Sequence, residues 1–123
     1  MLRNDDQTQP RRAKTRFGLE GFDAYQVALT FYREFRAATR GRRGHVVEQG
    51  NRAAESVVLN VAEAHPTTGA DRARRFRIAV DEAYECGAAL DLLEVRGELR
   101  QATLARLRAL LDRERAMLFK LSR

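Results

Sequence analysis

The central pattern of this chain is a run of apolar residues between His45 and His65 that recur at intervals of three and four. It comprises Val47, Gly50, Ala54, Val57, Val61 and Ala64, with Val46, Ala53, Val58 and Ala62 beside them. Such spacing keeps the main run on one side of an α-helix. A helix that is apolar around most of its circumference is normally enclosed by neighbours. The pattern therefore predicts a central helix over residues 45–65 that other helices enclose on nearly every side.

A line of polar residues interrupts this apolar surface, again at intervals of three and four: Gln49, Arg52, Ser56, Asn60 and Glu63. An unpaired buried polar group costs about 1–3 kcal/mol, so these side chains must stay hydrated or find partners on another helix. Glu85 lies in a later helical stretch, close enough to its apolar stripe to meet them. We hypothesise that these six residues form an interhelical polar network that fixes helix register.

Three further stretches have the periodicity of amphipathic helices. Residues 22–39 carry two adjacent stripes rich in Phe and Tyr, residues 70–96 a stripe of Ala and Leu, and residues 102–121 a leucine repeat. Pro66 blocks continuation of the central helix, and Gly97 closes the one that follows it. The aromatic surface of residues 22–39 is wider than one bundle interior requires, so it is also a candidate subunit interface.

The order of these stretches predicts the fold class. Four helices joined by short links form an all-α, antiparallel, up-down-up-down four-helix bundle, here over residues 17–123. No strand pattern competes with this prediction. Residues 1–16 have no periodicity and contain a compact basic run, so we expect them to be a disordered basic N-terminal arm.

Composition places the chain among single-domain proteins of the cytoplasm. It has 123 residues, and 33% of them are charged. No apolar run approaches the ~20 residues that span a bilayer, so no membrane partner is expected. Cys86 is the only cysteine, which rules out an internal disulfide and favours a cytoplasmic location.

The net charge of +6 is unevenly distributed along the chain. Residues 1–44 carry ten basic and five acidic groups, and residues 98–123 carry seven and three, whereas the middle carries six and nine. The candidate phosphate-binding residues are Arg11, Arg12, Lys14, Arg16, Arg40, Arg42 and Arg43. Two other interpretations remain open: the first four belong to a solvated tail, and the last three suit the negative end of the preceding helix. The dominance of arginine over lysine also fits a GC-rich genome.

The sequence does not favour an enzyme. Two histidines at helix ends and one core cysteine cannot supply a nucleophile, a base and an orienting group. Zinc spacing, the E-x-x-H motif of di-iron bundles and a glycine-rich phosphate loop are all absent, so no metal or cofactor is expected. Glu63, Glu85 and Glu114 could gather inside the bundle, but we expect structural pairing with Arg52 because an unpaired buried carboxylate is costly. Glu114 interrupts the leucine repeat and must face a partner, a gap or solvent.

One segment and its surroundings resemble a known bacterial family. The segment reads Ser56-Val-Val-Leu-Asn60-Val-Ala-Glu63, and it is followed by Phe76, Ile78-Ala79 and Glu85. Together with the early aromatic helix, Gln49 and Arg52, it is similar to the four-helix-bundle proteins encoded in intervening sequences of large-subunit ribosomal RNA genes. That family includes the accessory variability determinant of diversity-generating retroelements. The resemblance implies a homo-oligomer, typically a pentameric ring, with basic surfaces that in the retroelement branch contact nucleic acid and a reverse transcriptase.

Two functions follow from these observations. The first is a non-enzymatic adaptor that binds RNA or DNA through the seven basic residues, with salt-dependent affinity and little sequence preference. The second is a protein–protein assembly module that never touches nucleic acid, in which the apolar face of residues 22–39 does the binding and the arginines merely solubilise. Family analogy, an associational argument, leans toward the first.

Overall fold

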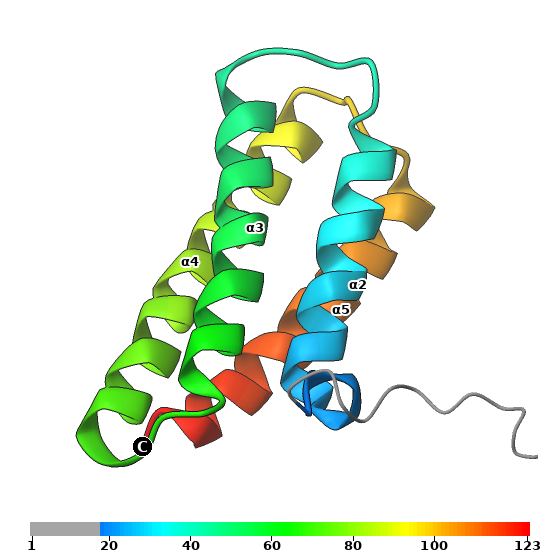
Figure 1. Ribbon diagram of the computed structural model, residues 1–123. Helices are drawn as coiled ribbons and strands as arrows, with labels where there is room; N and C mark the ends of the chain where they lie inside the picture. Colours follow the sequence, from blue (N-terminus) through cyan, green and yellow to red (C-terminus); the bar gives the residue numbers. More distant parts are fainter. Residues whose placement is uncertain (1–17) are drawn as a thin grey trace, which may run out of the picture.

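The computed structural model describes residues 18–123, which form four α-helices and one short 3-10 turn (Figure 1). The turn is η1 (Leu19–Gly21), and the helices are α2 (Asp23–Ala38), α3 (His45–Ala64), α4 (Gly69–Val95) and α5 (Gln101–Leu121). Each helix begins and ends within one residue of its predicted bounds. Residues 18–123 contain no strand. The predicted all-α four-helix bundle is therefore confirmed, while the predicted arm, residues 1–16, lies outside the described residues.

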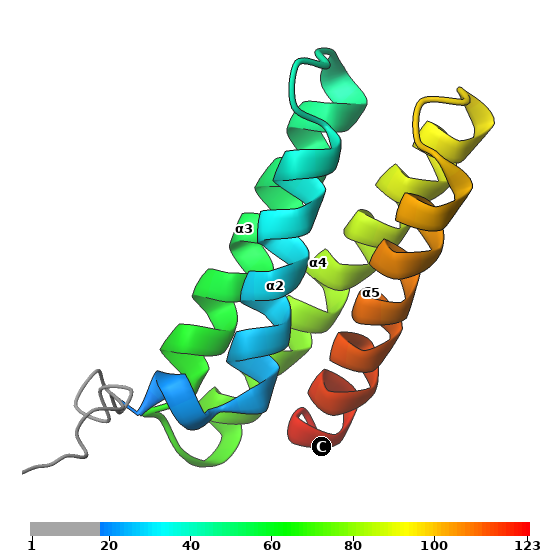
Figure 2. The ribbon, with the colours of Figure 1, turned by 90° about the vertical axis from the view of Figure 1, so that its right-hand side faces the viewer.

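Consecutive helices run antiparallel, and each packs against two others (Figures 1 and 2). α2 contacts α3 and α5, and α4 contacts the same two helices, with the α3–α4 pair sharing the largest contact. The α2–α3 and α4–α5 loops consequently lie at one end of the bundle. The α3–α4 turn, the C-terminus and η1 lie at the other end. This is the up-down-up-down order expected from short links.

The helix ends follow from local chemistry. Gly41 (φ 80°) and Gly97 (φ 68°) adopt left-handed conformations just after α2 and α4, which side chains with a Cβ atom rarely tolerate. The Arg96 and Gly97 amides donate hydrogen bonds back to Leu92 and Glu94 carbonyl oxygens, at 3.0 and 2.9 Å. Pro66 lies two residues after the end of α3, beyond the C-cap His65, and cannot continue the helix. The tight turns bring successive helices together as antiparallel neighbours.

The core combines large side chains from three helices with small ones from the fourth. Its largest fully buried apolar members are Phe35, Phe76, Leu90, Leu93, Leu104, Leu107 and Leu118. α3 contributes only Val, Ala and Gly to the buried set. Gly50 lies so close to Phe35 and Ala89 that a Cβ atom there would come within 2.5 Å of the Phe35 ring and 3.1 Å of the Ala89 methyl. The small residues of α3 thus permit the close approach of α2 and α4.

The prediction that other helices enclose α3 on nearly every side is wrong for a single chain. Only α2 and α4 pack extensively against it, and Leu59, Arg52 and Glu55 are exposed on its outer face. The physical reason is that charged side chains, among them Arg52, Glu55 and Glu63, occupy that outer face and stay in contact with solvent. None of the helices among residues 18–123 is long and apolar enough to cross a membrane.

Candidate nucleic-acid interface and interhelical groove

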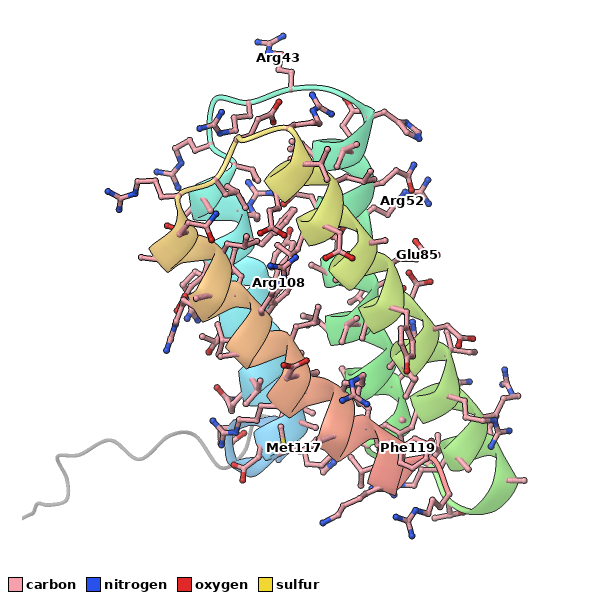
Figure 3. The ribbon with its side chains drawn as sticks, turned by 180° about the vertical axis from the view of Figure 1, so that it is seen from behind. Arg43, Arg52, Glu85, Arg108, Met117 and Phe119 are labelled. Carbon is pink, nitrogen blue, oxygen red and sulfur yellow. The ribbon has the colours of Figure 1, made fainter. Side chains whose placement is uncertain are left out.

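Arginine side chains gather at the end of the bundle where the α2–α3 and α4–α5 loops meet. Arg40, Arg42 and Arg43 are all exposed in the α2–α3 loop, and Arg43 projects outward from its tip (Figure 3). Arg100, exposed in the α4–α5 loop, shares this end. None of the four has a carboxylate within ion-pair distance among residues 18–123. We call these four residues the arginine end.

Arginines on the sides of the bundle behave differently, because several are paired with carboxylates. Arg106 on α5 donates two hydrogen bonds to Glu34 on α2, at 2.9 and 2.8 Å, which holds the pKa of that carboxyl below its usual value. Arg108 bridges α5 to α4 by contacting Asp91 and Glu94 at 2.6 and 2.9 Å. These two guanidinium groups are already paired with carboxylates and stabilise helix contacts, whereas the four of the arginine end have no such pair within residues 18–123.

The seven basic residues predicted to bind phosphate do not form one described patch. Arg40, Arg42 and Arg43 lie together at the arginine end, whereas Arg11, Arg12, Lys14 and Arg16 lie outside the described residues. The described chain starts at Gly18, at the opposite end of the bundle. The sequence analysis did not select Arg100 as a phosphate-binding candidate, because no other arginine is adjacent to it in the sequence. Only the antiparallel order of helices, with two short loops at one end, could have revealed its position.

The polar residues predicted on α3 line a groove of about 500 Å³ between α3 and α4. Its lining comprises Gln49, Arg52, Glu55, Ser56, Leu59, Asn60 and Glu63 from α3 with Glu82 and Glu85 from α4. The structure therefore brings all six residues of the hypothesised network to one surface. It also adds two carboxylates, Glu55 and Glu82, and exposed Leu59.

Few hydrogen bonds join those six residues to one another. Asn60 Nδ2 donates to the Ser56 carbonyl and hydroxyl oxygens, at 2.9 and 3.1 Å, which are bonds within α3. Glu63 accepts from Arg75 of α4 at 3.0 Å, rather than from Arg52. Arg52 and Glu85 project from the same side of the bundle (Figure 3), but no ion pair joins them among residues 18–123. The groove is thus a wet, acidic surface with one interhelical ion pair.

The carboxylates of the groove are crowded. Burial, followed by the neighbouring Glu85 carboxylate, raises the pKa of Glu82 above its ordinary value, while Ser56 and Arg52 partly offset this effect. Burial and the same two glutamates raise the pKa of the Cys86 thiol to about 12. Cys86 is 1% exposed, so it is the small buried apolar residue that its position in the Ala/Leu stripe indicated, and it is no nucleophile at neutral pH.

The prediction that the glutamates pair with Arg52 is wrong for Glu114, which is buried elsewhere in the bundle. Its side chain is 1% exposed on α5, and neither carboxyl oxygen has a hydrogen-bond partner among residues 18–123. Burial raises its pKa to about 8, against an attraction from Arg113 that lowers it. Because the helix turns Glu114 into the leucine core, away from the groove, the protein keeps this group protonated at neutral pH instead of pairing it.

No metal centre can be assembled from the part of the chain that the structure describes. Residues 18–123 contain no group of three His, Cys, Asp or Glu side chains placed to hold a metal ion. His65 packs its ring against Phe22, with ring centroids 4.7 Å apart, which makes it part of the bundle end rather than a base beside a nucleophile.

Fold and surface together define a class: a basic, all-helical bundle protein with exposed arginines at one end. Residues 22–120 match the family described as 23S rRNA-intervening sequence protein. The match covers most of the chain, so the protein belongs to that family, and the resemblance seen in the Ser56–Glu63 segment is confirmed. No curated protein matches the chain.

Proposed function

We propose that this protein is a non-enzymatic, oligomeric adaptor that binds nucleic acid through the phosphate backbone with little sequence preference. The carrying observation is the arginine end: Arg40, Arg42, Arg43 and Arg100 are exposed and unpaired within residues 18–123, while Arg106 and Arg108 are neutralised by carboxylates. Exposed guanidinium groups free of internal partners are suited to phosphate. The family description adds ribosomal RNA as the nucleic acid to test first.

We further propose a homo-oligomer, with a pentamer as the expected form. Exposed large apolar side chains support an additional contact surface: Leu59, Tyr84, Leu92, Val95 and Phe119. They lie on or beside α3, α4 and α5, not on α2, whose Tyr25, Leu29 and Tyr32 are half-buried against the core. The α2 surface favoured from the sequence is therefore mostly used inside the bundle. Symmetry would repeat the arginine end in each subunit and multiply its phosphate contacts.

The same apolar surface supports the alternative, an assembly module whose partner is a reverse transcriptase or another protein. It differs from the adaptor in one measurable respect, since it requires no nucleic-acid contact. A complex with a protein partner that survives nuclease treatment, formed by a chain that binds neither RNA nor DNA at low salt, would favour this alternative.

The test is the salt dependence of binding to fluorescent single-stranded RNA and duplex DNA. We expect affinity to fall steeply between 50 and 200 mM salt, because each neutralised phosphate contributes about −0.7 (single strand) to −0.9 (duplex) to the slope of log K against log salt. Replacing Arg40, Arg42 and Arg43 together with glutamine should reduce that slope on single strands by about 2 for each subunit that contacts the strand. Titrations by fluorescence anisotropy measure both quantities.

The matched control replaces Arg113, Arg115 and Arg123 with glutamine, because these exposed residues of α5 and its C-terminal end carry the same charge away from the arginine end. We expect the control to keep most of the parent's affinity and slope. Equal losses in the two triple variants would show that net charge alone drives binding. If the triple variant of the α2–α3 loop bound like the parent, the assignment of the interface would be overturned.

A further inference from the structure

The described chain starts beside an apolar hollow. Gly18 lies against His65, so close that a Cβ atom on it would be 3.3 Å from the imidazole Nε2. Next to this contact is a hollow of about 420 Å³ at the C-terminal end of α3. Its lining is largely carbon and comprises Leu19, Leu59, Ala62, Glu63, His65 and Pro66. Leu59 is 53% exposed there, so the hollow leaves a large apolar side chain uncovered where the chain enters the bundle.

The hollow continues into the acidic groove between α3 and α4. Leu59 and Glu63 line both depressions. Beyond them the groove has Glu55, Glu82 and Glu85 against a single lining cation, Arg52. The raised pKa of Glu82, caused by burial and then by Glu85, indicates carboxylates crowded without sufficient positive charge. Glu63 alone of the four lining carboxylates is in an ion pair within residues 18–123, with Arg75.

The residues immediately before Gly18 complement these two depressions in order. Phe17 is adjacent to Gly18, and Arg16, Lys14, Arg12 and Arg11 precede it. An extended chain advances about 3.3 Å per residue, so Arg11 can reach roughly 23 Å from Gly18. Along α3, at about 1.5 Å per residue, the distance from His65 to Arg52 is roughly 20 Å. The aromatic side chain is thus within reach of the hollow, and the four cations are within reach of the carboxylates.

We propose that Arg11–Phe17 docks onto α3 and α4 of its own chain, with Phe17 in the apolar hollow and the basic side chains over the Glu55, Glu82 and Glu85 carboxylates. Three observations support this occupant: the position of Gly18, the apolar-then-acidic order of the surface, and the matching aromatic-then-basic order of the segment. The contact lies within one chain, so it does not depend on the proposed nucleic-acid function. It assigns the basic run of the arm to the α3–α4 side and leaves the arginine end free.

A spin label attached at Ala13→Cys in the full chain tests the contact. Cys86 is buried with a raised pKa, so the new thiol is labelled selectively. We expect the methyl resonances of Leu59 to be broadened at low ionic strength and to recover in about 0.5 M salt, where exposed charges are largely screened. The methyls of Leu99, at the opposite end of the bundle, should be unaffected. Mixing labelled chains with unlabelled, isotope-enriched chains should give no broadening if docking is within one chain.

Two variants separate the apolar and ionic contributions. Phe17→Ser and the double variant Glu82→Gln/Glu85→Gln should each restore the Leu59 signal, whereas Glu48→Gln/Asp112→Asn, which removes the same charge from exposed positions, should not. Absence of broadening at low salt would overturn the proposal. Broadening that appears only in mixed samples would show that the segment docks onto a neighbouring subunit instead of its own chain. Recovery of the Leu59 signal in the control double variant would show that net charge, not the groove carboxylates, holds the segment.

Discussion

Replacing Glu114 with leucine is expected to stabilise the bundle at pH 8 by on the order of a few kcal/mol and to remove much of the pH dependence of stability between pH 5 and 8. The carboxyl is 1% exposed and has no hydrogen-bond partner among residues 18–123. Its pKa is about 8 in the folded protein, against an ordinary value of 4.5. Leucine continues the stripe that Glu114 interrupts and leaves no polar atom unpaired.

The sign follows from proton binding. Below pH 4.5 the carboxyl is neutral in both the folded and the unfolded chain. Between 4.5 and about 8 the folded chain keeps a proton that the unfolded chain has released, so the free energy of unfolding falls as pH rises, by at most about 1.4 kcal/mol per pH unit. Above about pH 8 the folded chain has also released this proton, so Glu114 lowers the free energy of unfolding no further. Hydrogen bonds from arginines lower the pKa values of Glu34 and Asp71. These two groups therefore make the free energy of unfolding rise with pH, and they do so at acidic pH, below the range of 5 to 8.

Urea unfolding of the parent and the Glu114→Leu variant at pH 5, 6.5 and 8, at one protein concentration, measures the effect. Glu82 has its pKa raised in the same direction, so Glu82→Gln reports its share of the slope separately. Glu48→Gln, at an exposed position, is the control and should leave the slope unchanged. A Glu114→Leu variant that keeps the parent's dependence on pH would show that another group carries it.

Adding one methyl group at Gly50 is expected to destabilise the bundle by about 1–3 kcal/mol, the typical cost of overpacking a core. The new Cβ atom of Gly50→Ala would lie 2.5 and 2.9 Å from two ring atoms of Phe35 and 3.1 Å from the Ala89 methyl. Phe35 is fully buried, so its ring cannot swing out into solvent and must shift within the core. Alanine improves helix propensity by about 1 kcal/mol, which offsets only part of the steric cost. Thermal melting should show a Tm several degrees below the parent's.

Gly87 provides a matched control in the middle of α4. A Cβ atom there would have its nearest neighbour, Leu111 Cδ2, at 3.7 Å, which is an ordinary van der Waals distance. Gly87→Ala should therefore stabilise the bundle by up to about 1 kcal/mol through helix propensity alone. If Gly50→Ala melted at or above the parent while Gly87→Ala behaved as expected, α2 and α4 would not approach α3 as closely as the structure shows.

Local pattern was sufficient for most of the fold. The periods of three and four in residues 45–65 and in the leucine repeat set the helices, and Pro66 and Gly97 set their ends, because these features act through the backbone nearby. Short links then required antiparallel neighbours. The exposure of α3 was not predictable in the same way, since its line of polar residues could either find partners on another helix or face solvent. The position of Arg100 beside the three arginines of the α2–α3 loop also required the tertiary arrangement.

The environments of three glutamates could not be predicted from the sequence. Glu63, Glu85 and Glu114 looked equivalent as candidates for pairing with Arg52. In the described part of the chain, Glu63 pairs with Arg75, Glu85 is exposed in a groove, and Glu114 is buried with no hydrogen-bond partner. The amino-acid sequence by itself determined the four helices, their order and the family, because these depend on spacing along the chain. The tertiary structure alone decided which of the charged side chains are buried, paired or free, because that depends on the rotation of each helix about its axis. Rotation is set by how side chains from different helices fit together, as Gly50 and Phe35 do.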